Sequence, residues 1–325
     1  MNFPPAIFGP GTLVELVQYR ASTQPDDPAF IYLANGIDDE IPLTNSHLDQ
    51  RAKQIAAWLQ EHHCAGERIL LLYPPGLDFI TAFFGCLYAG AIAVPVYPPR
   101  KNRSMLRIQS IAQNATAKVA LTTRDTLERV GTLIHEAPDL KNVLWFATDV
   151  MTPGGENQWK QPDINEKTIA FLQYTSGSTG TPKGVILSHG NMIHNSRLIQ
   201  LGFEHTRHDI GVFWLPSYHD MGLIGGILQP LYCGRTNVLM SPLSFLQKPF
   251  RWLAAITRYG ATTSGGPNFA YDLCVRQIKD DLLDQLDLST WKVAFNGAEP
   301  IMPETLENFA RKFEQIGRAS CRERV

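Results

Sequence analysis

The chain has 325 residues, of which 44% are hydrophobic, and a formal net charge of −2 at pH 7. It is long enough for one large or two modest domains with a buried core. The charge gives no electrostatic basis for nucleic-acid binding, which usually shows as a basic patch. Five scattered cysteines without a Cys-x-x-Cys pair argue against a zinc site or a disulfide framework and are consistent with a reducing cytoplasm.

The first hundred residues alternate between helical and strand-like segments. Residues 1–5 lack the basic-then-apolar pattern of a signal peptide, so we expect a cytoplasmic protein. Apolar side chains recur at helical spacing in residues 50–60, and residues 68–73 form a short apolar run. A helix over residues 77–89 and a strand near Val94 follow. This alternation predicts an α/β fold with a parallel sheet flanked by helices.

One uncharged stretch is long enough to resemble a membrane span. Residues 79–97 carry no charge over nineteen positions. Gly85, Gly90 and Pro95 interrupt the stretch, and its second half has the composition of a buried strand. We therefore interpret it as a core helix followed by a strand and expect no integral membrane segment.

The rest of the chain repeats the alternation after one stretch that we interpret as a linker. That stretch, residues 148–167, is rich in Pro, Gly and Asn. Beyond it, we expect strands at residues 169–174, 185–187, 209–215, 236–240, 262–264 and 291–296, and helices at residues 222–231, 249–259 and 306–313.

The most informative motif is Thr-Ser-Gly-Ser-Thr-Gly-Thr-Pro-Lys-Gly at residues 175–184. Hydroxyls and backbone N–H groups around glycines can surround an anion, and Lys183 adds a point charge suited to phosphate. A flexible Gly/Ser linker is the alternative, but both flanks are strand-like. The motif therefore predicts a polyphosphate site, with binding residues Thr175, Ser176, Gly177, Ser178, Thr179, Gly180, Thr181, Lys183 and Gly184.

The spacing of this motif differs from the P-loop, the dinucleotide fingerprint and the nucleophile elbow. A strand on each side also indicates a hairpin-type loop. The ten residues resemble the phosphate-binding signature of adenylate-forming enzymes, which include acyl-CoA synthetases and the adenylation domains of peptide synthetases.

Four further segments make the resemblance more specific. Residues 96–100, 215–226, 264–273 and 296–300 are similar to those of fatty acyl-AMP ligases, and the similarity covers roughly residues 10–315. It implies the large amino-terminal domain of an adenylate-forming enzyme, with mostly parallel sheets flanked by helices. It also implies ATP-dependent conversion of a medium- or long-chain fatty acid to acyl-AMP, with Mg²⁺, and an acyl carrier protein as partner.

The segment around His219 predicts an acyl pocket, because its glycines leave space beside apolar side chains. A core helix with close backbone packing is the alternative. The pocket residues expected are His219, Asp220, Met221, Gly222, Ile224, Gly225, Gly226 and, from a separate turn, Gly266. The resemblance places His219 near the reacting carboxylate, so that His219 and Lys183 are the two expected catalytic residues. A hydrogen-bonded core histidine is the alternative for His219.

The segment Asn296, Gly297, Ala298, Glu299 and Pro300 follows a strand and precedes a helix that begins near Pro303. An ordinary strand-to-helix turn is one interpretation. The Gly-Ala pair would also let a flat ring lie against the backbone, and the resemblance assigns the segment to adenine.

The last ten residues break the helical pattern that precedes them. They can be back-translated into a sequencing adapter, so we expect a truncated adenylation domain over residues 1–315, a non-native tail over 316–325 and no carboxy-terminal lid domain. A natural basic tail is the alternative. Two other functions stay open, a fatty acyl-CoA ligase and a non-catalytic acyl- or nucleotide-binding module, and no carboxylate cluster identifies a magnesium ligand.

Overall fold

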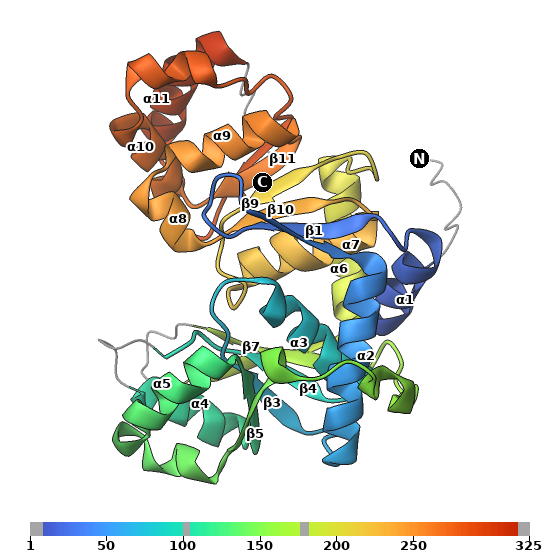
Figure 1. Ribbon diagram of the computed structural model, residues 1–325. Coiled ribbons are helices and arrows are strands. Elements are labelled where there is room, and N and C mark those ends of the chain that lie inside the picture. The colour runs from blue at the N-terminus through green and yellow to red at the C-terminus, as the bar shows by residue number, and fades with distance from the viewer. Residues whose placement is uncertain (1–8, 100–104, 176–181, 318–325) are drawn as a thin grey trace. The chain divides into compact units, whose positions relative to one another are not determined.

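The structure is a computed structural model, and it describes residues 9–99, 105–175 and 182–317 (Figure 1). Its contacts divide the chain into two compact units. Unit 1 contains residues 1–25, 45–74 and 78–197, and unit 2 contains residues 26–44, 75–77 and 198–325. The chain therefore crosses between the units several times, which the sequence did not indicate.

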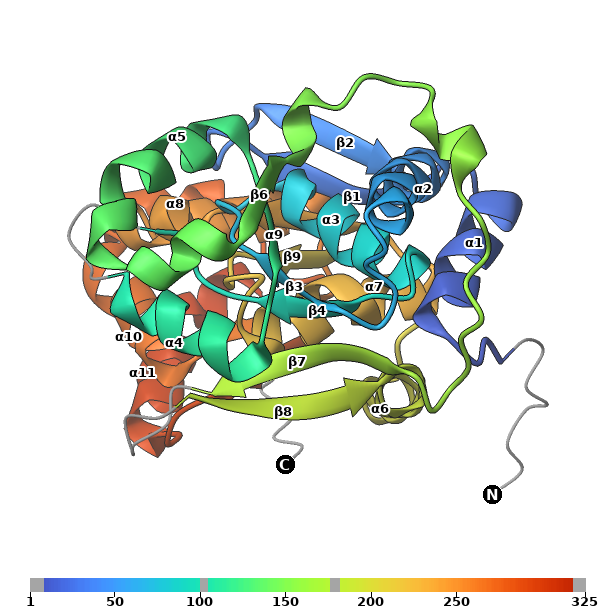
Figure 2. The same ribbon diagram turned by 90° about the horizontal axis from the view of Figure 1, so that it is seen from below.

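Unit 1 is built on a six-stranded sheet in the order β6-β5-β3-β4-β7-β8. All neighbours are parallel except β7 and β8, which pair antiparallel (Figure 2). The strands are β3 (Arg68–Leu71), β4 (Ile92–Pro95), β5 (Val119–Thr122), β6 (Leu144–Ala147), β7 (Ile169–Thr175) and β8 (Lys183–Ser188). The helices are α1 (Leu13–Thr23), α2 (Asn45–Glu61), α3 (Leu77–Tyr88), α4 (Leu106–Ala115), α5 (Arg124–Leu133) and the first part of α6 (His189–Phe203).

Helices cover both faces of this sheet, as the apolar strands require. Leu70, Val94 and Ala120 pack in one cluster with Ile108 and other side chains of α4. On the opposite face, the ring of Phe83 in α3 lies 5.5 Å from the ring of Phe171 in β7. Because successive side chains of a strand point to opposite faces, strands buried on both sides need the continuous apolar runs seen in the sequence.

Unit 2 repeats the same plan with a sheet in the order β12-β11-β9-β10-β1-β2, parallel except for β1 and β2. Its strands are β1 (Pro28–Leu33), β2 (Glu40–Thr44), β9 (Gly211–Phe213), β10 (Asn237–Met240), β11 (Thr263–Gly266) and β12 (Val293–Asn296). Its helices are η5, a π-helix (Met221–Leu228), then α7 (Gln229–Cys233), α8 (Pro242–Gln247), α9 (Phe250–Tyr259), α10 (Asn268–Gln277) and α11 (Pro303–Phe313). The α/β prediction is confirmed in both units.

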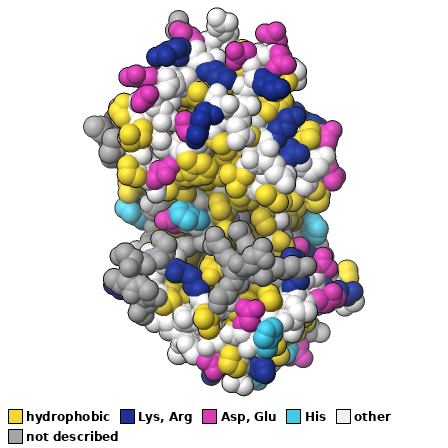
Figure 3. All heavy atoms as spheres, turned by 90° about the vertical axis from the view of Figure 1, so that its left-hand side faces the viewer, with side chains coloured by type: hydrophobic (Ala, Val, Ile, Leu, Met, Phe, Trp, Pro, Cys, Tyr) yellow, Lys and Arg dark blue, Asp and Glu magenta, His cyan; other side chains and the backbone are white. Residues whose placement is uncertain are grey.

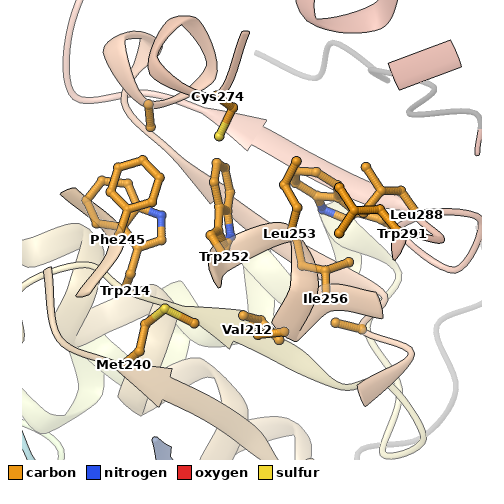
Figure 4. Close-up of a cluster of buried hydrophobic side chains, with 14 of the residues drawn as sticks. Val212, Trp214, Met240, Phe245, Trp252, Leu253, Ile256, Cys274, Leu288 and Trp291 are labelled. Atoms are coloured by element: carbon orange, nitrogen blue, oxygen red, sulfur yellow. The ribbon is translucent and has the colours of Figure 1, made fainter. Parts of the chain in front are cut away.

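An aromatic cluster fills the core of unit 2 on one side of its sheet. Figure 4 shows the rings of Trp214, Trp252 and Trp291 in a row, with Val212 of β9 beneath them. The Trp214 ring stacks on Phe245 at a centroid distance of 4.0 Å. Each buried aromatic ring removes a large apolar area from water, so this cluster is a main source of the stability of unit 2.

The uncharged stretch at residues 79–97 forms α3 and β4, as predicted. In the part of the chain that the structure describes, no helix combines the length and the apolar composition that crossing a membrane requires.

The interpretation of residues 148–167 as a linker is wrong. The segment is irregular, but both of its ends lie within unit 1. Trp159 Nε1 donates to the carbonyl of Tyr88 at 2.8 Å, and the backbone N–H of Lys160 donates to Gln60 Oε1 at 3.0 Å. Side-chain hydrogen bonds thus hold in place a backbone whose composition suggested a free connection.

Unit 2 has exposed apolar side chains, and the chain near residue 316 packs against its core. Exposed apolar side chains of unit 2 include Leu243, Phe269 and Met302, and Figure 3 shows hydrophobic side chains among interspersed basic and acidic ones on one face. Ile316, at the start of the predicted tail, packs against the aromatic cluster, and its carbonyl accepts from the Leu288 N–H at 2.8 Å. Residues 318–325 of that predicted tail lie outside the described residues.

Candidate active site

The predicted polyphosphate motif sits on the antiparallel edge of the unit 1 sheet. Thr175 ends β7, Lys183 begins β8, and the two are register partners across the strand pair. Both residues are exposed. Ser176, Gly177, Ser178, Thr179, Gly180 and Thr181 lie outside the described residues. The antiparallel pairing of β7 with β8 confirms the hairpin-type arrangement expected from the flanking strands.

The structure adds a second cation to this end of the hairpin. Arg107 Nη2, in the first turn of α4, donates to the carbonyl of Thr175 at 3.0 Å. Arg107 thus contacts the end of β7 at Thr175, whose register partner on β8 is Lys183. The sequence motif could not reveal Arg107, because it lies 68 positions before Thr175 and only the pairing of distant elements brings the two together.

Gly184 is needed for a contact within the hairpin. A Cβ atom at Gly184 would lie 3.0 Å from Cζ of Tyr174, its register partner. The Tyr174 hydroxyl in turn donates to Asn114 Oδ1 of α4 at 2.6 Å. The glycine therefore lets the tyrosine ring cross the strand pair and tie it to α4.

His219 and Asp220 lie at the start of the π-helix in unit 2. His219 Nδ1 is 2.6 Å from Asp220 Oδ1, and both side chains are about half exposed. The hydrogen bond with Asp220 raises the pKa of His219, against the opposing effect of burial. The same bond lowers the pKa of Asp220, which also accepts from the Met221 N–H at 2.7 Å. Asp220 and the Met221 N–H therefore engage Nδ1 of His219, and Nε2 makes no hydrogen bond to the described residues.

The segment after His219 adopts a π-helix over residues 221–228 rather than an α-helix. The wider turn is uncommon and often occurs at functional sites. Gly222 permits it to start beside the preceding loop, since a Cβ there would lie 2.1 Å from the carbonyl oxygen of Pro216. At Gly222 the structure shows close backbone packing, which was the alternative to an acyl pocket.

A cavity of about 470 Å³ lies against the π-helix within unit 2. That volume falls within the range of small-molecule sites. Of the residues predicted for the acyl pocket, five contribute to its wall, and Ala298 of the predicted adenine segment joins them. The lining comprises Ile199, Phe203, His205, Phe213, His219, Asp220, Met221, Ile224, Gly225, Gln229, Arg235, Thr263, Phe295 and Ala298.

Three predicted pocket glycines do not line this cavity. Gly222 faces Pro216, as described above. Gly226 is buried with the Phe213 ring 3.6 Å from where its Cβ would be, and Gly266 is packed against the Trp214 ring, with Cζ2 at 2.8 Å from its Cβ position. These glycines shape the packing around the cavity instead of its surface.

Strand β9 separates the cavity from the aromatic cluster. Val212 and Trp214 point into the cluster, whereas Phe213 between them points into the cavity. The Phe213 ring lies 5.7 Å from that of Phe295, which in turn stacks on Phe203 at 6.2 Å. Because successive side chains of a strand point to opposite faces, one face of β9 packs against the aromatic cluster and the other lines the cavity.

The cavity changes character with depth. At its exposed end are His219, Asp220 and Ala298, and its walls are mainly aromatic and aliphatic. Its buried end holds four polar side chains, which we call the polar floor: His205, Gln229, Arg235 and Thr263. Burial, followed by the charge of Arg235, lowers the pKa of His205 to about 4. The sequence analysis missed all four floor residues.

The predicted adenine segment begins where β12 ends. Ala298 has a left-handed backbone with φ of 67°, and a Cβ at Gly297 would be 3.3 Å from Met221 Cε. Asn296 Oδ1 is buried without a hydrogen-bond partner among the described residues. Glu299 Oε1 accepts from the Phe269 N–H at 2.7 Å, at the start of α10, and Pro300 is exposed.

The residues described here do not bring three or more His, Cys, Asp or Glu side chains together as a metal site. The four described cysteines, Cys64, Cys86, Cys233 and Cys274, are buried and unpaired with one another.

Comparison with known proteins gives one consistent result. The AMP-binding enzyme family model matches residues 17–319. The chain is 44% identical over 310 residues to the medium-chain-fatty-acid–[acyl-carrier-protein] ligase JamA of Moorena producens, covering 94% of this chain and 52% of JamA. It is 36% identical over 343 aligned residues to the corresponding ligase TtuA of Teredinibacter turnerae, covering 94% of this chain and 53% of TtuA.

A solved structure agrees with these relatives. The crystal structure of a fatty acyl-adenylate ligase from L. pneumophila, in complex with acyl adenylate and pyrophosphate, superposes with a TM-score of 0.91 at 42% identity. The match covers 97% of this chain and 55% of that protein. The chain thus spans about half the length of the curated relatives that it matches.

Proposed function

The chain belongs to the AMP-binding enzyme family, and we propose that the full-length protein is a fatty acyl-AMP ligase. It activates a medium- or long-chain fatty acid with ATP, forms acyl-AMP, releases pyrophosphate and passes the acyl group to an acyl carrier protein. The relatives JamA and TtuA are named as medium-chain-fatty-acid–[acyl-carrier-protein] ligases, which supports this choice of substrate and partner.

The observation that carries the proposal is the composition of the cavity. One cavity in unit 2, whose walls are mainly apolar, is lined both by His219, Met221, Ile224 and Gly225 and by Ala298. A fatty acid needs apolar walls, and its carboxylate must meet the nucleotide. A single cavity that combines a histidine mouth, aliphatic walls and the Ala298 turn meets both needs.

The cavity and the resemblance of residues 175–184 to a phosphate-binding signature support the following roles. Lys183 and the hydroxyls and N–H groups of residues 175–181, with Gly184, hold the polyphosphate of ATP. The fatty carboxylate lies at the mouth of the cavity, where Nε2 of His219 donates a hydrogen bond to it while Asp220 holds Nδ1. The carboxylate then attacks the α-phosphorus and pyrophosphate leaves. This chemistry depends on positioning and charge stabilisation rather than on a protein nucleophile.

The segment 296–300 fits a purine. Ala298 and Gly297 offer a flat backbone surface, and Asn296 Oδ1 is a buried acceptor without a partner among the described residues, suited to an exocyclic amine. Glu299 and Pro300 complete the proposed adenine segment, with Glu299 anchoring it to α10. Magnesium would arrive with the triphosphate, whose oxygens are its preferred ligands. The four described cysteines form no disulfide with one another, which is consistent with a reducing cytoplasm.

Pyrophosphate release tests the proposal directly. The full-length protein, given ATP, Mg²⁺ and dodecanoate, should release pyrophosphate, and adding a holo acyl carrier protein should produce acylated carrier. Formation of acyl-CoA in preference to acylated carrier would establish the acyl-CoA ligase alternative; some relatives of 36% identity are named as putative fatty-acid–CoA ligases. If no acid of any chain length gave pyrophosphate, the chain would be a binding module.

A further inference from the structure

The polar floor of the cavity contains a buried charge that the proposed function does not use. Arg235 is 3% exposed and lies between α7 and β10. None of its three guanidinium nitrogens has an oxygen or nitrogen hydrogen-bond partner among the described residues, although the Cys233 side chain lies close enough to favour its charge. Five N–H donors are thus buried next to the cavity that Arg235 lines, where an arginine almost always has partners.

The neighbours of Arg235 do not compensate for this burial. Burial lowers the pKa of the guanidinium, and the nearby Cys233 and Asp209 offset only part of that effect. The Asp209 carboxylate is already engaged, since it accepts from the N–H and the hydroxyl of Thr206 and from the hydroxyl of Thr262. The other titratable side chain close by, His205, is held neutral. A buried charge without a partner is costly, so an anion is the missing component.

Nη1 of Arg235 occupies a space that the missing side chain of Gly211 leaves open. A Cβ atom at Gly211, the first residue of β9, would lie 2.6 Å from Nη1 of Arg235 and 1.9 Å from Oδ1 of Asn237. Any larger residue at position 211 would displace both groups. Asn237 Oδ1 is itself unpaired among the described residues, but a neutral amide cannot neutralise a guanidinium.

We propose that this cavity accepts an acyl substrate with a second carboxylate at its far end, an α,ω-dicarboxylic acid, and that Arg235 binds this ω-carboxylate. The inference rests on the proposed function, in which the reacting carboxylate lies at His219. The apolar walls formed by Phe203, Phe213 and Ile224 contact the methylene chain between the two ends. A carboxylate matches the planar fork of a guanidinium with two parallel hydrogen bonds.

The preference for a dicarboxylic over a monocarboxylic acid tests directly whether Arg235 binds the ω-carboxylate. The ratio of kcat/KM for decanedioate to that for decanoate should fall roughly 10- to 100-fold in Arg235→Met, because a hydrogen bond to a charged group is lost for one substrate only. Arg258→Met is the matched control, because Arg258 pairs with Glu40 at the surface of the same unit, and it should leave the ratio unchanged. An equal ratio in the wild type and Arg235→Met overturns the inference.

Two readouts separate this inference from the proposed function and from a structural role. Thermal stabilisation by decanedioate, compared with decanoate, needs no catalysis; it should be larger in the wild type and equal in Arg235→Met. It decides the inference even if neither acid releases pyrophosphate, a result that would count against the proposed function alone. Without ligand, Arg235→Met should unfold at the same or a higher temperature, since it removes an unpaired buried charge. A lower unfolding temperature would assign Arg235 a structural role and overturn the proposal.

Discussion

The two units use one architecture for different purposes. In the described residues, each has a six-stranded sheet with four parallel strand pairings and one antiparallel edge pairing. In unit 1 the antiparallel edge carries the glycine- and hydroxyl-rich loop with Lys183. In unit 2 the corresponding edge, β1–β2, turns at Asn35, whose side chain accepts from three backbone N–H groups, and the candidate pocket lies against β9 and β12 instead. Two sheets with the same pattern of strand pairing therefore carry their candidate sites at different positions.

The units also differ in how completely they are packed. Unit 1 buries apolar side chains on both faces of its sheet, whereas unit 2 fills one face of β9 with aromatic rings and leaves the other open. Shortening a buried side chain should therefore cost more stability on the packed face of β9 than on the open face.

Truncation in the aromatic cluster should have the largest effect. Trp252→Ala removes a fully buried ring that contacts Trp214, Phe245 and Trp291, and should cost about 3–5 kcal/mol of unfolding free energy. Phe213→Ala, which enlarges a space that is already open, should cost clearly less. Urea denaturation of both variants measures the difference, and equal losses would mean that the cavity is as well packed as the cluster.

Acid should weaken both units through one buried histidine in each. Burial lowers the pKa of His189 in unit 1 and of His205 in unit 2 to about 4. Because the unfolded chain protonates near pH 6.5 and the folded chain does not, the stability is complete above pH 6.5 and is lost as the pH falls toward 4. Each histidine contributes at most about 3 kcal/mol to this loss.

Hydrogen exchange at several pH values can assign the acid effect to a unit. His189→Gln should reduce the acid sensitivity of unit 1 amides only, and His205→Gln that of unit 2 amides only. Acid sensitivity that persists in both units of the double variant would mean that other groups dominate.

Removal of the cation on the hairpin edge should impair activity without unfolding unit 1. In the full-length protein, Lys183→Ala should lower ATP-dependent adenylation by about 1.5–3 kcal/mol in transition-state stabilisation, the value of a charged hydrogen bond, or roughly 10- to 150-fold. Arg107→Ala should have a smaller effect, since it contacts the backbone of Thr175. Lys118→Ala, an exposed lysine of the same unit, is the control. Unchanged kinetics in Lys183→Ala would remove this residue from the polyphosphate site.

Alanine substitutions at two glycines of the π-helix should have clearly different effects on stability. Gly222→Ala places a methyl group 2.1 Å from the Pro216 carbonyl and should destabilise by about 1–3 kcal/mol. Gly225→Ala meets only the Phe213 ring at an ordinary 3.6 Å, so stability should change by less than about 0.5 kcal/mol. Thermal unfolding compares the pair, and a stable Gly222→Ala would show that the loop at Pro216 can move.

The sequence by itself determined the family and the α/β plan, and it predicted chemical roles for single segments. Residues 175–184, 219–225 and 296–300 could be recognised because each motif is contiguous, and because helical and strand periodicities are local properties of the chain. The core helix and strand at residues 79–97 were predicted for the same reason.

Only the tertiary structure decided which residues share the cavity. Phe203, Gln229 and Phe295 come from α6, α7 and β12, and His205 and Arg235 come from the connections that follow α6 and α7. No motif in the sequence relates these five residues. The irregular residues 148–167 also looked unattached until side-chain hydrogen bonds fixed them to α2 and α3. The cavity exists because side chains from distant segments leave a space between them. Arg235 likewise becomes a buried charge only when the chain folds around it.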